Sequence, residues 1–321
     1  RPAMLIRLLI TFGLTAPGLA AAGTFLRVGY FPNVTHAQGI IGSHTSRQGK
    51  GWFETRLGTD VAIRWLPFNA GPSAVEAILA GSVDLTYVGP NPVLNGYIRS
   101  GGEEVRVLAD AAEGGAALVV TAKSGIRTAD DFRGRRVGTP QLGNTQDVAA
   151  RTWMRNQGLK VTLTGGDATV LPAANPDLLQ LFAQGKIDAA WTVEPWVSRL
   201  EQEAGGRIFL EQADAITTVL AASARFLAEK TQLAEKFRRA HVELTAWIAA
   251  HPVEAMETVR AGLTAETRRE VSPMLVAGAW RRLRFTSEIE PARFAALVDD
   301  ARNTGLLPRS IPLGRLFPQA R

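Results

Sequence analysis

The sequence predicts an α/β protein made of two similar lobes that face each other across a cleft. From residue 26 onward, short apolar runs alternate with helical patterns, separated by Gly, Pro and Asn. The segment Gly-Ser-Val-Asp at residues 81–84, which precedes one apolar run, is echoed by Gly-Lys-Ile-Asp at residues 185–188 before another. A length of 321 residues also suits two modest domains, each with its own core.

The first half of the chain predicts three strands, each followed by a helix. The strands are expected at residues 26–31, 61–68 and 83–88, and the helices at residues 36–48, at 74–80 and up to about residue 100. Gly49 and Gly81 are placed where a helix ends, because glycine readily adopts the left-handed conformation found there. Strands separated by helices at this spacing pair in parallel through right-handed crossovers, so we expect parallel-dominated sheets.

The second half repeats the pattern before it becomes mainly helical. Strands are expected at residues 136–139, 169–171 and 189–193, and helices at residues 144–157, 177–184 and 195–204. After an apolar run at 219–222 the pattern is helical to the end. We therefore assign residues 23–117 and 218–321 to a discontinuous first lobe and residues 118–217 to a second. The connections near residues 115–120 and 210–220 would act as a hinge.

The first 22 residues have the features of a secretory signal peptide. A basic start at residues 4–7 is followed by an apolar run at residues 8–19 and by three alanines at residues 20–22. The apolar run is too short to span a bilayer comfortably. A buried N-terminal helix is the alternative interpretation. The signal-peptide interpretation predicts export to the periplasm.

The composition argues against several classes of activity. The formal net charge is +6, and the chain has no cysteine, so disulfides, thiolate metal sites, a cysteine nucleophile and a lipid anchor are excluded. The four histidines have no metal-ligand spacing, and no nucleotide-binding or hydrolase motif is present. Short arginine runs such as residues 133–136 are typical of solvated faces and do not indicate nucleic-acid binding. We expect no enzyme activity, no cofactor and no metal, and a mild preference for anionic small molecules.

Four loops between predicted strands and helices are rich in glycine and small polar residues. They are residues 32–36, 69–73, 89–92 and 142–146. Such loops offer backbone N–H groups and short side-chain donors at the positive end of a helix dipole, which forms an anion site without a fixed cation. The alternative is ordinary helix capping, in which Asn, Thr, Ser and Gly are common.

A fifth loop, residues 194–196, closes the echoed motif in the second lobe. Glu194 could cap the following helix, with Pro195 at its first position and Trp196 in the core. It could instead face the cleft and accept a donor from a ligand, with Trp196 forming an apolar wall. The sequence leaves both interpretations open.

The motifs together resemble the nitrate, sulfonate and taurine group of ABC-transporter substrate-binding proteins. The resemblance covers residues 24–300 and is carried by segments 28–33, 81–84, 88–92, 138–147 and 192–196. It implies a type II periplasmic-binding-protein fold, with two mixed-sheet α/β lobes joined by a hinge and a helical C-terminal part. The implied partners of this monomeric binding protein are an inner-membrane permease and its ATPase. The resemblance also implies ligand contacts from residues of both lobes: Asn33, Thr35, His36, Asn91, Asn144, Thr145, Gln146, Glu194 and Trp196.

An aliphatic sulfonate or taurine is the expected ligand, because a sulfonate is a permanent monoanion that suits neutral donors at helix ends. Nitrate, a phosphonate or a pyrimidine-type ligand is the alternative. A biosynthetic enzyme of the same fold is disfavoured, because the pyrimidine synthases that share this architecture are expected to carry a cysteine cluster. A sensor domain would need a partner that the sequence does not reveal.

Overall fold

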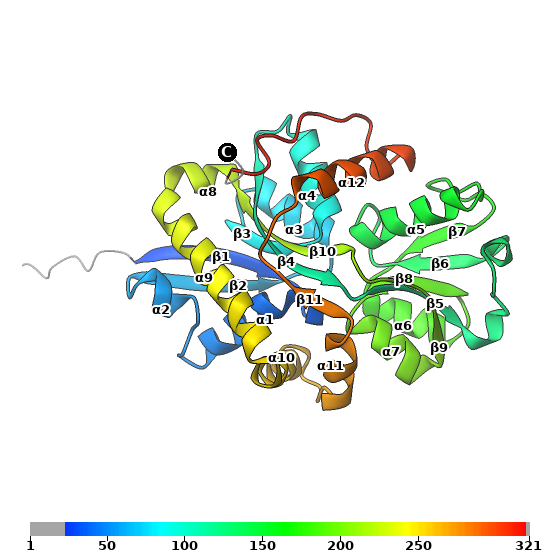
Figure 1. The fold of residues 1–321 in the computed structure, drawn as a ribbon, viewed down its shortest axis with the longest axis horizontal. Coiled ribbons are helices and arrows are strands. Elements are labelled where there is room, and N and C mark those ends of the chain that lie inside the picture. The colour runs from blue at the N-terminus through cyan, green and yellow to red at the C-terminus, as the bar shows by residue number, and fades with distance from the viewer. Residues whose placement is uncertain (1–22, 319–321) are drawn as a thin grey trace, which may run out of the picture.

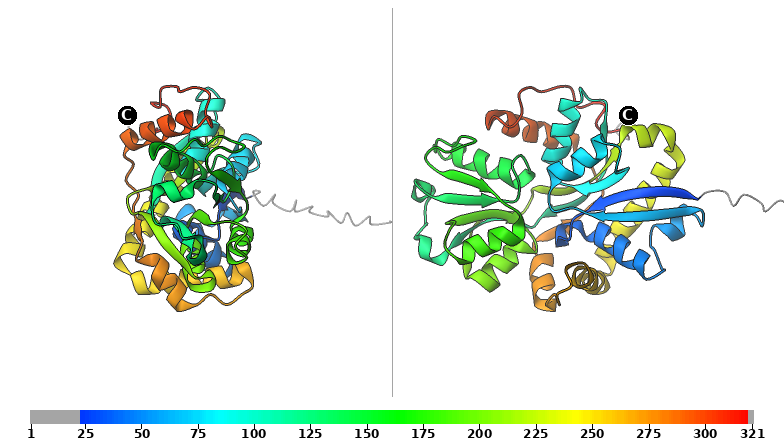
Figure 2. Two further views of the ribbon diagram at one scale, coloured as in Figure 1. Left: turned by 90° about the vertical axis from the view of Figure 1, so that its right-hand side faces the viewer. Right: turned by 180° about the vertical axis from the view of Figure 1, so that it is seen from behind.

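The computed structural model describes residues 23–318 and consists of two α/β lobes side by side (Figure 1). Each lobe has one sheet with helices packed on both faces, and the view from behind shows the same division (Figure 2). The two-lobed α/β fold predicted from the sequence is confirmed. The predicted signal peptide at residues 1–22 lies outside the described residues.

The first lobe contains a six-stranded sheet in the order β11-β4-β10-β3-β1-β2. Its strands are β1 (Thr24–Tyr30), β2 (Val61–Pro67), β3 (Leu85–Val88), β4 (Val105–Gly114), β10 (Ile216–Ser223) and β11 (Leu283–Phe285). Strand β1 pairs in parallel with β2 and β3, whereas β10 is antiparallel to β3 and β4, and β11 is antiparallel to β4.

The second lobe contains a five-stranded sheet in the order β7-β6-β8-β5-β9. Its strands are β5 (Ala116–Thr121), β6 (Arg136–Thr139), β7 (Thr169–Pro172), β8 (Ala189–Val193) and β9 (Gly206–Gln212). Strand β6 is parallel to β7 and β8, and β5 is antiparallel to β8 and β9. The sheet therefore has the same arrangement as the β4-to-β2 part of the first sheet.

The mixed sheets that the resemblance implies are confirmed, and parallel pairing does not dominate them: the first sheet has two parallel and three antiparallel pairs, and the second has two of each. The antiparallel strands β4, β5, β9 and β10 lie next to the crossings between the lobes. Only Gly115 separates β4 from β5, and residues 213–215 separate β9 from β10. No helix intervenes there, so the alternation of strand and helix that indicated the other strands is absent.

Helices cover both faces of each sheet. Those of the first lobe before the crossing are α1 (Ala37–Arg47), α2 (Glu54–Leu57), α3 (Gly71–Leu79) and α4 (Pro90–Arg99), and those of the second lobe are α5 (Thr145–Asn156), α6 (Asn175–Ala183) and α7 (Trp196–Ala204). The C-terminal helices α8 (Ala224–Glu229), α9 (Thr231–Ala250), α10 (Pro252–Thr267), α11 (Pro273–Trp280) and α12 (Pro291–Asn303) return to the first lobe. Helices α11 and α12 also contact α7 and α5 of the second lobe. Within residues 23–318, no helix is both long and apolar enough to cross a bilayer.

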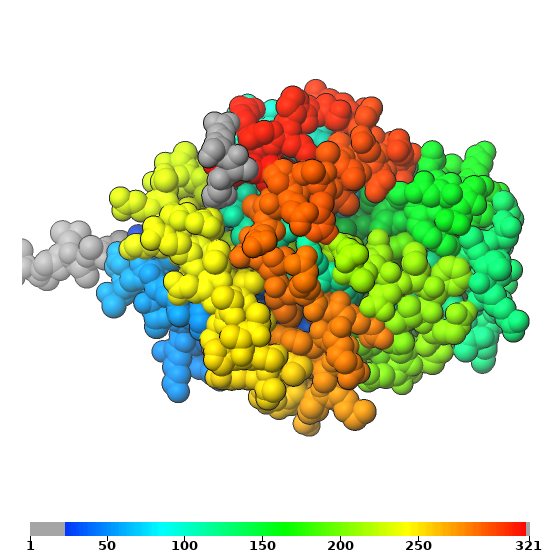
Figure 3. Space-filling model, in the orientation of Figure 1, coloured from blue at the N-terminus to red at the C-terminus, as the bar shows by residue number. Residues whose placement is uncertain are grey.

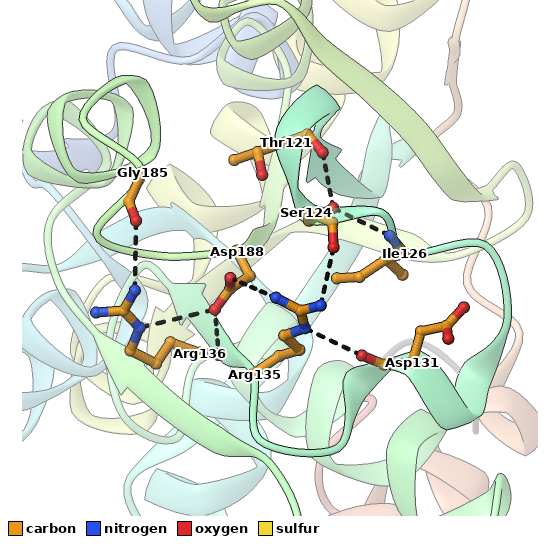
Figure 4. Close-up of polar contacts among 8 residues, drawn as sticks. All are labelled: Thr121, Ser124, Ile126, Asp131, Arg135, Arg136, Gly185 and Asp188. Atoms are coloured by element: carbon orange, nitrogen blue, oxygen red, sulfur yellow. Dashed lines mark hydrogen bonds and ion pairs between the residues drawn. The ribbon is translucent and has the colours of Figure 1, made fainter.

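The echoed Gly–Asp segments occupy equivalent places in the two lobes. In the first lobe Asp84 accepts hydrogen bonds from the backbone N–H (2.8 Å) and guanidinium of Arg27, whose Nη1 donates to Gly81 O. In the second lobe Asp188 accepts from the backbone N–H of Arg136 at 2.9 Å, and the Arg136 Nη2 donates to Gly185 O (Figure 4). In both lobes the aspartate ties the start of one strand to its parallel neighbour.

The arginines of the run at residues 133–136 form ion pairs and hydrogen bonds within the protein, whereas arginines on a solvated face need no such partners. Arg135 also reaches Asp188, at 3.3 Å, and donates from Nη2 to Ser124 O at 2.9 Å (Figure 4). Arg133 forms an ion pair with Asp167 at 2.8 Å. These arginines stabilise the edge of the second lobe, so their charge is largely compensated within the fold.

The crossing from β4 to β5 depends on two consecutive glycines in the left-handed region. Gly114 has φ +72° and Gly115 has φ +67°. A Cβ atom on Gly114 would lie 2.4 Å from Arg282 O and 2.8 Å from Ala213 O, distances that the backbone could meet only by moving. The crossing therefore requires glycine for both its dihedral angles and its close packing.

We expect Gly114→Ala to destabilise the protein more than the same change at Gly125. Gly125 has φ +69° but nothing within 4 Å of its Cβ position, so Gly125→Ala costs only the left-handed strain, about 1–2 kcal/mol. Gly114→Ala adds the contact with two carbonyl oxygens, worth about 1 kcal/mol or more. Urea unfolding of both variants measures the difference. Equal losses would show that the crossing tolerates a side chain.

Candidate ligand-binding site

A narrow cavity lies between the two lobes, at the loops that follow the strands, within a space of about 370 Å³ that includes a part open to solvent. We call it the central cavity. From the first lobe it is lined by Phe31, Asn33, Thr35, His36, Asn69, Ala70, Gly71, Gly89, Pro92 and Thr217. From the second lobe it is lined by Pro140, Asn144, Thr145, Gln146, Asn175 and Val193. All four loops proposed from the sequence contribute to this lining.

The N-terminal ends of five helical segments meet at the central cavity. They are α3, α4, α5 and α6, together with α1 and the 3₁₀ turn Val34–His36 that leads into it. The first N–H groups of a helix have no partner within the helix, and the helix dipole makes this end positive. None of the lining side chains, all within the described residues, is Asp, Glu, Lys or Arg. The arrangement can therefore hold an anion through neutral donors.

His36 contributes a neutral imidazole to the lining. Its ring stacks on Phe31 with the ring centroids 4.2 Å apart, and its Nδ1 accepts a hydrogen bond from the Phe31 N–H at 3.3 Å. This bond places the ring proton on Nε2. Burial lowers the pKa of His36 to about 3, so the ring stays uncharged at neutral pH. His36 can act as a donor to an anion without contributing a positive charge.

We expect the buried histidines to make the protein less stable in acid. The pKa of His36 is lowered to about 3 and that of His241 to about 4, each mainly by burial. Between these values and about pH 6.5 the unfolded chain binds protons that the folded state excludes, so stability falls as pH falls, by up to about 1.4 kcal/mol per pH unit for each ring. Thermal unfolding between pH 7 and pH 4.5 should show a smaller loss for His36→Gln than for the parent. The exposed control His251→Gln should follow the parent; a His36→Gln curve that also follows it would contradict this account.

Asn144 positions the loop of the second lobe that enters the central cavity. It is the N-cap of α5: its Oδ1 accepts from the Asp147 N–H at 2.8 Å, and its Nδ2 donates to Gln146 Oε1 at 3.2 Å. The Asp147 carboxylate in turn accepts from Thr139 Oγ1, from the Gly143 N–H and from Arg151 Nε. Capping and cavity lining thus coexist at Asn144, and a buried network fixes its position.

A hydrogen bond between two side chains joins the lobes beside the central cavity. Trp196 Nε1, from the start of α7, donates to Asn33 Oδ1 at 3.0 Å. The guanidinium of Arg199 lies over the Trp196 ring, 4.7 Å from its centroid. Asn33 lines the cavity, whereas Trp196 lines a larger hollow outside it. Trp196 therefore lies outside the lining of the central cavity and bonds to the opposite lobe.

Asn91 lies beside the central cavity and not in its lining. Its backbone N–H donates to Thr145 Oγ1 of the other lobe at 3.4 Å, and the residue contributes to the wall of a different hollow, although both polar atoms of its side chain are buried. Thr145 and Gln146 line both spaces. The structure thus brings Asn33, Thr35, His36, Asn144, Thr145 and Gln146 together around one cavity and places Asn91 next to it.

Glu194 bonds to residues of the protein itself and does not face the central cavity. It is fully buried and accepts hydrogen bonds from the N–H and Oγ of Ser198 in the first turn of α7. Pro195 is the N-cap of α7 and does not occupy its first helical position, so Glu194 lies one residue before the cap and not at the cap position expected from the sequence. It also pairs with Arg282 at 2.8 Å, and Arg282 in turn reaches Glu201 at 2.9 Å. Burial raises the pKa of Glu194, against the opposing effect of Ser198 and Arg282. The structure places Glu194 outside the lining of the central cavity, where it connects the second lobe to the segment before β11.

Two asparagines of the lining, Asn69 and Asn175, were not among the contacts expected from the sequence. Asn175 is buried, begins α6, and its Oδ1 accepts from Thr192 Oγ1 at 2.6 Å. Asn69 precedes α3 in a loop that the sequence had singled out without assigning this residue to the site. The signal was available, because the segment Ala-Ala-Asn-Pro at residues 173–176 also connects a strand end to a helix start.

Known proteins with similar sequences and folds include several named for ligand binding. The profile of the NMT1-like family matches residues 20–263. A provisionally named binding protein of Brucella abortus (strain 2308) is 25% identical over 258 residues, which cover 80% of this chain and 71% of that protein. The taurine-binding periplasmic protein of Escherichia coli (strain K12) is 26% identical over 141 residues, or 44% of this chain and 42% of that protein.

A solved structure has the same fold. The alkanesulfonate-binding protein of Xanthomonas axonopodis pv. citri, bound to MOPS, superposes with a TM-score of 0.77 at 20% sequence identity. The superposition covers 93% of this chain and 99% of that one. These relatives fall in the group that the motifs resemble, and the likeness in structure establishes the periplasmic-binding-protein fold.

Proposed function

The chain belongs to the NMT1-like family, and from that premise we propose that it is the solute-binding protein of an ABC importer. Its ligand is a small organic monoanion, with aliphatic sulfonates and taurine as the first choice. The anionic head binds in the central cavity between the lobes. The protein is exported to the periplasm, where it acts as a monomer without catalysis and delivers its ligand to an inner-membrane permease driven by an ATPase.

The observation that carries this proposal is the chemistry of the central cavity. Five helical N-termini converge on a space whose lining residues are all uncharged. A sulfonate keeps a single negative charge at any physiological pH and offers three acceptor oxygens to such donors. A lining of fixed cations would favour a dianion, and it would also bind a monoanion with less selectivity.

The proposed contacts come from both lobes. Asn33, Thr35 and His36 would hold the anion from the first lobe, and Asn144, Thr145 and Gln146 from the second. A ligand held from both sides favours the closed arrangement, because its binding energy is available only when the lobes are together. The bond between Trp196 and Asn33 adds to the same closed state.

A panel of small anions tests the proposal. Thermal unfolding is measured with methanesulfonate, hexanesulfonate, taurine, nitrate, methylphosphonate and a pyrimidine, followed by calorimetric titration of those that stabilise. We expect the sulfonates to stabilise most, by about 2.7 kcal/mol at a concentration of 100 Kd. If only nitrate or the phosphonate stabilises the protein, that anion replaces the sulfonates as the proposed ligand class. If none of the anions stabilises it, the proposed binding function is excluded. Small-angle scattering with and without the best ligand would show the closure.

A further inference from the structure

The hydrogen bonds around the central cavity share one direction. Several lining side chains carry both a donor and an acceptor, and in each of them the acceptor atom already bonds to a donor of the protein. The donor atom is left for a ligand. The proposed function uses the absence of charge in this lining, whereas the direction of these bonds is a second and independent property.

Asn33 receives its bond from the opposite lobe. Its Oδ1 accepts from Trp196 Nε1 at 3.0 Å, and because an indole N–H can only donate, the bonded atom of the amide must be the oxygen. Asn33 is 5% exposed, and its Nδ2 has no hydrogen-bond partner within residues 23–318. Unlike the two polar atoms of Asn91, this nitrogen is accessible to a small molecule. The donor of the Asn33 amide therefore remains available to a ligand.

The second lobe presents Gln146 and Asn175 in the same way. Asn144 Oδ1 accepts from the Asp147 N–H at 2.8 Å, so the Asn144 Nδ2 is the atom that donates to Gln146, at 3.2 Å. An amide nitrogen donates to an oxygen, which leaves the Nε2 of Gln146 without a partner among the described residues. Asn175 Oδ1 accepts from Thr192 Oγ1 at 2.6 Å, a distance typical of a hydroxyl donor. Both remaining amide nitrogens are accessible.

His36 follows the same pattern in the first lobe. Its Nδ1 accepts from the Phe31 N–H, which can only donate, so Nε2 carries the ring proton. This Nε2 makes no hydrogen bond within the part of the chain that the structure describes, and the residue lines the central cavity. Burial lowers the pKa of His36 to about 3, so at pH 5 the ring is still a neutral donor.

Other lining groups are not fixed in this direction. The hydroxyls of Thr35 and Thr145 can donate or accept, and the exposed amide of Asn69 has no partner within residues 23–318 that would orient it. Thr145 Oγ1 already accepts the bond from the Asn91 N–H, which favours donation by its hydroxyl. Among the described side chains, those that are fixed by a protein donor and present a donor to the cavity are Asn33, His36, Gln146 and Asn175.

An oxoanion without a proton suits this set of donors, whereas an acid group that keeps one O–H does not. Its hydroxyl would be buried against donors with no fixed side-chain acceptor, which lowers affinity about tenfold or more. A sulfonate has no such hydroxyl, but a phosphonate keeps one proton at pH 5. An ammonium group would also lack an acceptor, so taurine must place its sulfonate in the cavity.

The bond from Trp196 links this selection to the position of the lobes. Trp196 begins α7 of the second lobe and Asn33 belongs to the first, so the Asn33 oxygen is engaged only while the lobes are together. In Figure 3 the orange and red segments of the first lobe lie against the green second lobe, where α11 and α12 contact α7 and α5. When the lobes separate, the Asn33 amide loses this partner and can turn.

We propose that the central cavity selects anionic heads that carry no proton, and that Trp196 is a positioning residue for this selection because it directs the Asn33 amide donor toward the ligand. This inference rests on the proposed function and deepens it. The ligand class narrows to fully deprotonated heads such as sulfonates, and hydrogen phosphonates are rejected. Nitrate meets the same condition, so the selection concerns the proton and not the central element.

Three monoanions of similar size test the selection by calorimetric titration at pH 5. They are methanesulfonate, dimethylphosphinate and hydrogen methylphosphonate, and the last two differ only in a methyl group that replaces a hydroxyl. We expect methanesulfonate and dimethylphosphinate to bind about tenfold or more tighter than hydrogen methylphosphonate. If dimethylphosphinate binds no better than hydrogen methylphosphonate, the proposal is overturned and the binding function stands. Failure of all three to bind would remove the proposed function itself.

Variants of the bonded pair test the positioning role. Trp196→Phe removes the indole N–H but keeps an aromatic ring, so the Asn33 amide can turn its oxygen to the P–OH. The preference for dimethylphosphinate over hydrogen methylphosphonate should fall about threefold or more, whereas a merely structural role of Trp196 would lower all affinities alike. Asn33→Asp keeps one oxygen for the Trp196 bond and offers a second to the head. Its charge weakens all three monoanions, but hydrogen methylphosphonate least, so the preference should reverse.

Trp153→Phe is the matched control. Trp153 lies outside the lining of the central cavity, and its indole N–H has no hydrogen bond within residues 23–318. This variant should keep the preference of the parent protein. If Trp196→Phe and Asn33→Asp keep it as well, the bond between these two residues does not set the selection and the positioning role is excluded.

Discussion

Asn144→Asp is expected to abolish anion binding while the protein remains folded. The substituted side chain differs from asparagine by one amide group but adds a negative charge to a cavity whose lining residues are all uncharged. A like charge about 4 Å from the bound anion costs about 4 kcal/mol at an effective dielectric constant of 20, which lowers affinity about a thousandfold. Calorimetric titration with a sulfonate that binds the parent protein gives the ratio directly.

The folded state should tolerate this change because Asn144 is the N-cap of α5. Aspartate caps a helix as well as asparagine does and interacts favourably with the helix dipole. Asn144 is 4% exposed, so burial of the new carboxylate opposes this gain, and thermal unfolding without ligand should show a moderate loss that leaves the protein folded. Asn303→Asp, at the exposed end of α12, makes the same charge change far from the cavity and should leave affinity unchanged. A loss of less than about tenfold in Asn144→Asp would contradict an anionic head at this position.

Arg151→Met is expected to destabilise the protein by about 3–5 kcal/mol. Arg151 and Asp147 form an ion pair of 3.1 Å whose side chains are 1% and 0% exposed. Removal of the guanidinium leaves the Asp147 carboxylate buried without its counter-charge. It also frees Thr162 O, to which Arg151 Nη1 donates at 2.7 Å. Urea unfolding measures the loss, and a small loss would mean that the remaining donors to Asp147 suffice.

Two further variants separate the buried charge from the lost packing. The double variant Asp147→Asn with Arg151→Met removes both charges and should recover much of the stability, because no uncompensated carboxylate remains. Arg239→Met removes one partner of an exposed pair with Glu235 and should cost less than about 1 kcal/mol. If the double variant is no more stable than Arg151→Met, packing accounts for the effect of Arg151.

Most of the framework could be predicted from the chain alone because its signals are local. Strands β1, β3 and β8 were predictable because they are mainly apolar, mainly buried runs next to helices. The echoed segments at residues 81–84 and 185–188 also marked two copies of one unit. Strand β9 gave no such signal, because it is only partly buried and follows α7 after a single glycine. Strand β11 has three residues and lies within a mainly helical region, so no periodicity could reveal it.

The donors of the central cavity belong to what the sequence itself determined. Asparagine, threonine and glycine at the ends of strands favour the start of a helix, whose first N–H groups are free to donate. The topology of the fold then brings equivalent strand ends to the same edge of each sheet. Asn175 satisfies the same rule and could have been included on that basis.

Only the tertiary structure decided which of these polar groups are already committed to the fold. Glu194 pairs with Arg282, 88 residues away, and Asn33 accepts from Trp196, 163 residues away. The Asn91 amide, by contrast, is buried and has no hydrogen-bond partner within residues 23–318, although its sequence context matches that of the other loop asparagines. A pattern of residues fixes which donors and acceptors exist and which element carries them. The packing of the two lobes decides whether a given group bonds to a distant residue, faces the cavity or stays without a partner. This packing depends on contacts between residues far apart in the chain, which a local pattern does not contain.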